Sequence, residues 1–193
     1  MTRIRKLAPV ITAVAAALAL GACGSDDGGG NPDSKLTVEQ ATAPLEGASP
    51  PLTAVRDQAN QVLDEGVEGY ETRVAQLKGT PVVVNKWASW CGPCRLEFPL
   101  FQTQAVKRAK EVAFLGVGSN DSQDGLETFL QQLPLPYPTY LDPDFRIAKQ
   151  LGGVVQSLPS TTFYDSTGDL VFTHPGPYRS EEDLAADIDR YAQ

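Results

Sequence analysis

The sequence is poor in the residues that bind metals: of its 193 residues, one is histidine and three are cysteine. The histidine is His174, for which we expect a position in a surface loop. Cys91 and Cys94 lie close together, whereas Cys23 lies far upstream. A structural zinc site takes four ligands, usually cysteines and histidines. The sequence therefore predicts no metal site, and no cofactor is expected.

The N-terminal apolar run, Leu7–Leu20, is too short to span a membrane as a helix. It has 14 residues, whereas a membrane-spanning helix needs about 20. Three basic residues precede it within the first six positions. A basic start followed by a short apolar core is typical of an export signal. We therefore predict a signal peptide over residues 1–22.

The motif LGAC, Leu20–Cys23, resembles the bacterial lipobox. The resemblance implies lipidation of the Cys23 sulfur and cleavage just before it. An ordinary cleavage site with a chance cysteine and an uncleaved anchor are the alternatives, and all three place the rest of the chain outside the cytoplasm. Two or more acyl chains would hold the protein firmly at the membrane. The expected location is the cell membrane, where the protein is anchored as a lipoprotein.

Positive charge is scarce in the mature chain. Without the signal peptide, 13 lysines and arginines remain against 24 acidic residues, a net charge of −11. This balance argues against nucleic acid as a partner and against a polybasic lipid-binding surface. A soluble acidic surface is the ordinary explanation, and it says nothing about the chemistry.

The chain is predicted to hold one domain. Residues 23–51 are expected to be a flexible tether, because GSDDGGGNPDSK cannot bury a core and three prolines interrupt the sequence that follows. Residues 52–193 suffice for a domain with a proper core. Short β-branched runs alternate with helical patterns in the first half, and a hairpin and a helix follow. This order predicts an α/β fold with a mixed sheet.

The two close cysteines form the motif CGPC, between a predicted buried strand, PVVVNKW, and a predicted long helix. At a helix N-terminus, free backbone N–H groups and the helix dipole favour a thiolate at Cys91 and lower its pKa. Cys94 lies one turn later, close enough to resolve a mixed disulfide, and Pro93 suits the first turn. We predict a redox-active dithiol. The alternative, a permanent structural disulfide, would close too small a loop to constrain the unfolded chain much.

The stretch WASWCGPC, preceded by PVVVN, resembles the thioredoxin superfamily. The continuation CRLEFP, and the region between VAFLGVGSND and LDPD, resemble the TlpA/ResA-type extracytoplasmic thiol-disulfide oxidoreductases. The resemblance covers about Ala59 to the C-terminus. It implies a thioredoxin-like fold with a central mixed β-sheet flanked by helices. It also implies a TlpA-type insert between the second half of the βαβ unit and the hairpin with the cis-proline.

The resemblance also assigns roles at the cysteines. It implies that Cys91 is the nucleophile and Cys94 the resolving cysteine. Trp90 flanks the exposed sulfur, and Gly92 and Pro93 complete the surface that binds the substrate.

Two further positions follow from the same resemblance. Pro159 matches the proline held in cis opposite the cysteines, with Leu158 before it at the substrate-binding surface. A simple strand-edge proline is the alternative. Glu97 matches a glutamate that tunes cysteine ionisation, and a solvated carboxylate on a helix face is the alternative.

The chain departs from its relatives at two neighbouring positions. Cytoplasmic thioredoxins carry a buried aspartate where this chain has Asn85, so another group, such as Glu97, must transfer the proton of Cys94. Many relatives have phenylalanine in place of Lys86. Alternation along a strand would send Lys86 to the face opposite Asn85, and the sequence gives it no function.

The sequence thus predicts a membrane-tethered enzyme that exchanges disulfides with exported proteins. Its expected partners are client proteins with thiols or disulfides and a membrane electron donor or acceptor, such as a CcdA- or DsbD-like protein. The Gly-Pro pair between the cysteines favours a reductant, for instance one that keeps apocytochrome c thiols reduced. An envelope oxidant remains the alternative. A peroxiredoxin-like peroxidase would need a lone peroxidatic cysteine in a different setting. A non-catalytic binding lipoprotein is the remaining class.

Overall fold

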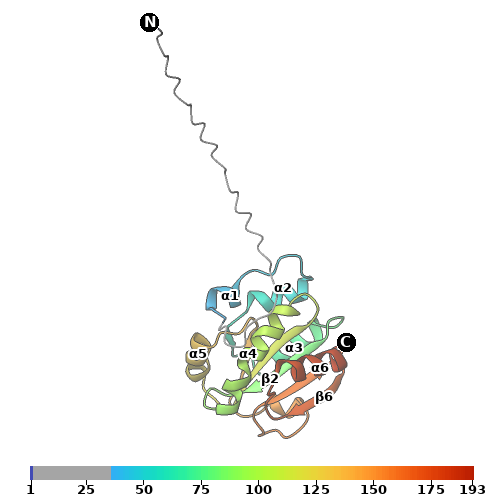
Figure 1. Cartoon of the computed structure of the whole chain (residues 1–193). Coiled ribbons are helices and arrows are strands. Elements are labelled where there is room, and N and C mark those ends of the chain that lie inside the picture. Colours follow the sequence, from blue (N-terminus) through green and yellow to red (C-terminus); the bar gives the residue numbers. More distant parts are fainter. Residues whose placement is uncertain (2–35) are drawn as a thin grey trace.

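The computed structural model describes Met1 and residues 36–193, so the predicted signal peptide, Cys23 and the first part of the predicted tether lie outside the described residues. Strands and helices alternate through most of the described chain (Figure 1). In chain order they are α1 (Val38–Thr42), α2 (Pro50–Asp57), β1 (Val62–Leu63), α3 (Gly66–Gln76), β2 (Val82–Trp87), α4 (Gly92–Lys107), β3 (Ala113–Ser119), α5 (Gln123–Gln132), β4 (Thr139–Asp142), the 3₁₀ helix η1 (Ala148–Gln150), β5 (Ser160–Tyr164), β6 (Leu170–Pro175) and α6 (Glu181–Tyr191).

The strands form one mixed sheet in the order β1-β4-β3-β2-β5-β6. The four strands from β1 to β2 in this order pair in parallel, whereas β5 pairs antiparallel with both β2 and β6. The predicted α/β fold with a mixed sheet and a closing β5–β6 hairpin is therefore confirmed. The region predicted as the insert holds α5, β4 and η1.

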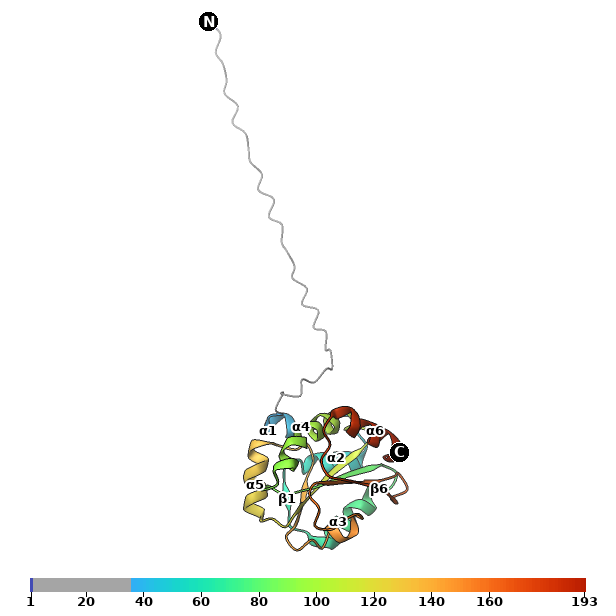
Figure 2. The ribbon, with the colours of Figure 1, turned by 60° about the horizontal axis from the view of Figure 1, so that its bottom comes forward.

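Helices cover both faces of the sheet, with α4 and α6 on one face and α3 on the other (Figure 2). The central strand β2 is buried along its whole length, which explains why it begins with three valines and ends with a tryptophan. Successive side chains of a strand point to opposite faces. Asn85 and Trp87 accordingly contact residues of α4, while Lys86 points to the other face, where it contacts the segment after η1.

An aromatic cluster fixes α4 against the sheet. The ring of Trp87 in β2 lies 4.8 Å from that of Phe98 in α4 and 5.1 Å from that of Phe129 in α5. Phe98 and Phe129 pack edge to face at 4.8 Å. Such pairs contribute about 0.5–1.5 kcal/mol beyond their burial, so the helix that follows the cysteines has a rigid base.

The domain begins earlier than the predicted boundary at Leu52. Helix α1 starts with a capping box between Thr37 and Gln40, and Ala41 is buried. The carbonyl of Ala41 accepts a hydrogen bond of 2.8 Å from Nη1 of Arg56 in α2. The described part of the predicted tether is therefore packed on the domain, because a side chain from α2 satisfies its backbone.

Close packing between β3 and α5 gives a prediction for Gly118. A Cβ atom on Gly118 would lie 2.3 Å from Cδ1 of Leu126, and Leu126 is fully buried. We expect Gly118→Ala to lower the free energy of unfolding by about 1–3 kcal/mol, the usual cost of overpacking, measured by urea denaturation. Gly92→Ala is the control for stability, since a Cβ there meets nothing within 4 Å. Equal stability of the wild type and Gly118→Ala would contradict the tight packing.

Candidate active site

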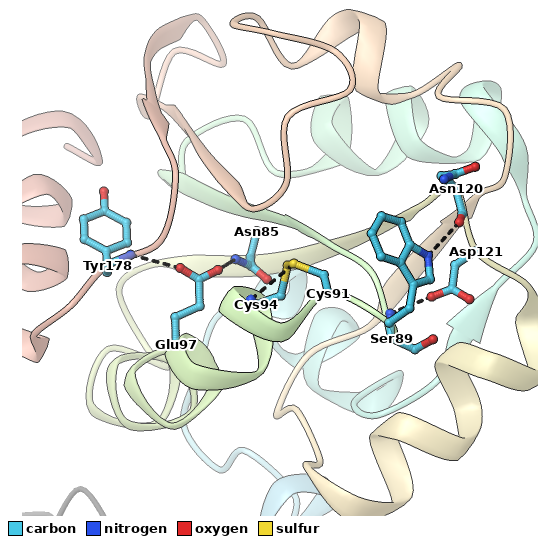
Figure 3. Close-up of a disulfide and its surroundings, with 9 residues drawn as sticks. Asn85, Ser89, Cys91, Cys94, Glu97, Asn120, Asp121 and Tyr178 are labelled. Atoms are coloured by element: carbon cyan, nitrogen blue, oxygen red, sulfur yellow. Dashed lines mark hydrogen bonds between the residues drawn. A yellow bond between two sulfur atoms is a disulfide. The ribbon is translucent and has the colours of Figure 1, made fainter.

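The cysteines lie at the junction of β2 and α4. Strand β2 ends at Trp87, and Cys91 is the N-cap residue of α4, with Pro93 in its first turn. Cys91 and Cys94 form a disulfide with their Cα atoms 5.3 Å apart (Figure 3). The sulfur of Cys91 accepts a hydrogen bond from the backbone N–H of Cys94 at 3.3 Å. The predicted setting at a helix N-terminus is thus the one observed, and the backbone N–H of Cys94 could donate to a Cys91 thiolate in the same way.

The two sulfurs differ in accessibility. Cys91 is 5% exposed and Cys94 is completely buried. Both cysteines are therefore largely buried, and of the two only Cys91 has any exposed surface.

Trp90 directly precedes Cys91 in the chain, and 60% of its surface is exposed. Its indole N–H donates to the carbonyl of Asn120 at 3.0 Å, and the backbone N–H of Ser89 donates to Oδ2 of Asp121 at 2.6 Å (Figure 3). These two bonds hold the turn before Cys91 against the loop between β3 and α5. The tryptophan is a fixed, exposed apolar surface next to the reactive sulfur.

Pro159 lies at the same end of the sheet as the cysteines. The Leu158–Pro159 peptide bond is cis, as the resemblance implied. Ser160, the next residue, pairs with Lys86 of β2, so the chain enters β5 beside the end of the strand that leads to Cys91.

Glu97 is fully buried, so the alternative of a solvated helix-face carboxylate is wrong. Its Oε1 accepts a hydrogen bond from Nδ2 of Asn85 at 2.9 Å, and its Oε2 accepts one from the backbone N–H of Tyr178 at 3.1 Å (Figure 3). Burial raises the pKa of Glu97 from its ordinary 4.5 to about 7, although the two hydrogen bonds lower it. This carboxyl group can therefore gain or lose a proton near neutral pH.

Asn85 suits both protonation states of Glu97. Its Nδ2 donates to the carboxylate, while its buried Oδ1 has no hydrogen-bond partner among the described residues. An amide carries a donor and an acceptor on one planar group, so half a turn of it would offer Oδ1 to a protonated carboxyl. An aspartate at this position could not donate to the carboxylate.

Other polar groups line the same face of the sheet around Asn85. Asn85 lies beside Thr161 in β5, and beside Gly116 in β3, which in turn pairs with Thr139 of β4. The hydroxyls of both threonines are buried and lack partners within the described chain. The face of the sheet around Asn85 therefore carries buried polar groups in three strands, β2, β5 and β4.

Tyr178 is a site residue that the sequence did not reveal. Its hydroxyl donates to Oδ2 of Asp187 at 2.7 Å, and its ring stacks on that of His174 at 4.1 Å. Nδ1 of His174 lies 3.2 Å from the same carboxylate oxygen. The expectation of a loop position for His174 is wrong, because this residue belongs to β6 and is only partly exposed. Tyr178 contributes its backbone N–H to Glu97, and a backbone group leaves no signal in the residue type.

This fold and this cysteine pair define a thioredoxin-like domain with a CxxC disulfide. The chain belongs to the AhpC/TSA family, whose model matches residues 55–173. It is 28% identical over 116 residues to the thiol-disulfide oxidoreductase ResA of Bacillus subtilis, a match that covers 60% of this chain and 63% of that relative. The chain thus spans less than two thirds of the length of that protein.

Solved structures agree with this assignment. A DsbF homologue from Corynebacterium diphtheriae is 29% identical with a TM-score of 0.56, over 61% of this chain and 75% of the other. The exposed lipoprotein thioredoxin Etrx1 of Streptococcus pneumoniae is 25% identical with a TM-score of 0.53, over 61% and 89%.

The raised pKa of Glu97 predicts how stability depends on pH. Between pH 4.5 and about 7 the folded protein keeps a proton that the unfolded chain has lost, so the free energy of unfolding falls as the pH rises through this window. At about 1.4 kcal/mol per pKa unit, the loss amounts to about 3 kcal/mol. We expect Glu97→Gln to remove this part of the dependence in urea denaturation of the oxidised protein at pH 5 and pH 8.

Glu127→Gln is the control, because Glu127 is exposed on α5 and bonds only to Gln123 there. It should keep the wild-type difference between the two pH values. If Glu97→Gln kept that difference too, Glu97 would not titrate near neutral pH.

Proposed function

We propose that the protein is a membrane-tethered thiol-disulfide oxidoreductase that reduces disulfides of exported proteins. The observation that carries this proposal is a cysteine pair at a helix N-terminus, of which only Cys91 has any exposed surface, with a buried carboxyl group on the same helix that titrates near neutral pH. The likeness to a thiol-disulfide oxidoreductase and to a DsbF homologue supports the same chemistry.

The exchange takes two displacements. In the reduced protein the Cys91 thiolate attacks a client disulfide, forms a mixed disulfide and releases the first client sulfur as a thiolate. Glu97, one turn beyond Cys94 on α4, takes the proton of the Cys94 thiol. The Cys94 thiolate then attacks the Cys91 sulfur and releases the second client thiolate. The client gains two electrons, and the protein is left with the Cys91–Cys94 disulfide.

The electrostatics around the cysteines favour a reductant. An oxidising pair needs a strongly stabilised thiolate, and here a single backbone N–H bonds to the Cys91 sulfur. The neighbouring cation, Arg95, is occupied elsewhere, since its guanidinium stacks on Phe129 and Nη1 donates to Gln132. Above about pH 7 the negative charge of Glu97 opposes a second negative charge on the cysteines. These features stabilise the disulfide over the dithiolate.

The lipobox-like motif that ends at Cys23 and the likeness to an exposed lipoprotein thioredoxin support the proposed location at the membrane. Within residues 36–193, no helix has the length and apolar character that a membrane span requires. Outside the cytoplasm, a protein that reduces its clients must itself be reduced again. A membrane electron donor of the CcdA or DsbD type would supply those electrons, and a disulfide of apocytochrome c is a suitable client, because its reduction yields the free thiols.

A redox titration tests the direction. We expect a potential near or below about −270 mV for the Cys91–Cys94 pair against glutathione or dithiothreitol, because within the described chain one backbone N–H and no neighbouring cation bonds to the Cys91 sulfur; a potential near about −120 mV would instead identify an oxidant. Cys94→Ser should accumulate mixed disulfides with clients, whereas Cys91→Ser should form none. If Cys91→Ser kept the full function of the wild type, the cysteine chemistry would not be needed and the protein would be a non-catalytic binding protein. Peroxide consumption without added thioredoxin would point to a peroxidase.

The tether is tested on the full chain expressed with its own N-terminus in a bacterium. The wild type should label with palmitate and remain with the membrane fraction. Cys23→Ser should lose the label and appear in the soluble extracytoplasmic fraction, because its sulfur is the attachment point. Cys91→Ser is the matched control and should stay at the membrane. A wild type without label would contradict lipidation.

A further inference from the structure

Lys86 is a completely buried lysine that the thiol exchange does not use. Its ammonium donates to the carbonyls of Val154 and Val155 at 3.0 and 2.8 Å. Burying an ammonium is costly unless its protons are bonded, and burial lowers its pKa while the carboxylate of Asp142 raises it. The buried ammonium of Lys86 thus makes both of these hydrogen bonds to one short segment, the chain that follows η1.

That segment is anchored at a second point as well. The carbonyl of Leu151 accepts hydrogen bonds of 2.7 Å from the hydroxyls of Thr162 and Thr173. Gly152 and Gly153 follow with positive φ angles of 69° and 66°, which glycine adopts without strain. The backbone therefore turns sharply between the threonine anchor and the lysine anchor.

The anchored segment leads to the active site. It ends at Leu158 and Pro159, and the next residue pairs with Lys86 itself. Lys86 thus holds the middle of the segment and lies beside its end, five residues before Cys91 in the chain. Val154 has its carbonyl fixed by Lys86, yet 71% of its surface is exposed. An outward apolar side chain on a fixed backbone is suited to contact with a polypeptide.

We propose that Lys86 is a positioning residue that holds residues 151–158 as a preorganised docking loop for the client polypeptide, with Val154 in contact with the client. The inference rests on the proposed function. A loop that is already ordered loses little conformational freedom when the client binds, so the anchor raises affinity for proteins. A small dithiol needs no such loop to reach Cys91.

The test compares Lys86→Met with Lys149→Met, which removes an exposed lysine from the same region. For insulin reduction we expect Lys86→Met to lower kcat/KM about tenfold through KM, the cost of ordering the loop on binding. The rate of reaction with dithiothreitol and the redox potential should stay at wild-type values, and Lys149→Met should match the wild type throughout. Equal losses with insulin and dithiothreitol, or a shifted potential, would overturn the docking role.

Two measurements decide the matter if Lys86→Met is unstable. Val154→Asp changes only an exposed side chain and should lower kcat/KM for insulin with unchanged thermal stability; unchanged kinetics would overturn the client contact. Amide exchange of residues 152–158 should accelerate in Lys86→Met while β3 stays protected, and uniform exchange would overturn the anchoring. A wild type that did not reduce insulin would contradict the proposed function and the docking role together, whereas amide exchange tests the anchor independently.

Discussion

The hydrogen bond from Asn85 to Glu97 joins β2 to α4 beside the disulfide, and the geometry of the site depends on it. A carboxylate that solvent does not reach needs donors for its oxygens. The strand supplies one donor, and the loop before α6 supplies the other through Tyr178, 81 residues along the chain from Glu97. One side chain therefore fixes a strand, the cysteine helix and the C-terminal region relative to each other. The burial that requires these bonds also brings the pKa of Glu97 close to neutrality. The fixed position of the carboxyl group and its titration near neutral pH therefore have the same cause.

The C-terminal helix takes part in the site although it carries no reacting group. Asp187 in α6 accepts a hydrogen bond from the hydroxyl of Tyr178, and His174 stacks on the same ring. The backbone N–H that reaches Glu97 is held by these contacts. Ion pairs between α4 and α6, from Lys107 to Glu181 and from Arg108 to Asp189, lie at the surface and add little stability. The part-buried contacts of Asp187 therefore link α6 to the loop that reaches Glu97.

Local patterns made most of the fold predictable from the sequence. The β-branched run predicts the strand β2, and the glycine and proline between the cysteines predict the start of a helix. Both signals come from residues close together in the sequence, and the structure contains both elements. Long-range partners could not be predicted in this way. Tyr178 acts through its backbone N–H, and Lys86 bonds to backbone carbonyls, so neither contact requires a particular residue type at both ends. Helix α1 was missed for a related reason, because it is short and depends on a side chain of α2 for one of its carbonyls.

The two unusual residues of β2, Asn85 and Lys86, are neighbours, and strand geometry gives them separate tasks. Alternation sends Asn85 to the face covered by α4, where it donates a hydrogen bond to Glu97. It sends Lys86 to the opposite face, where it donates to the carbonyls of Val154 and Val155. If Lys86 lay on the same face as Asn85, its positive charge would lie close to Glu97 and the cysteines. Here the sheet separates the ammonium from the carboxylate that titrates. The strand that ends at the cysteines can thus support the chemistry on one face and the docking loop on the other, and a change in one need not disturb the other.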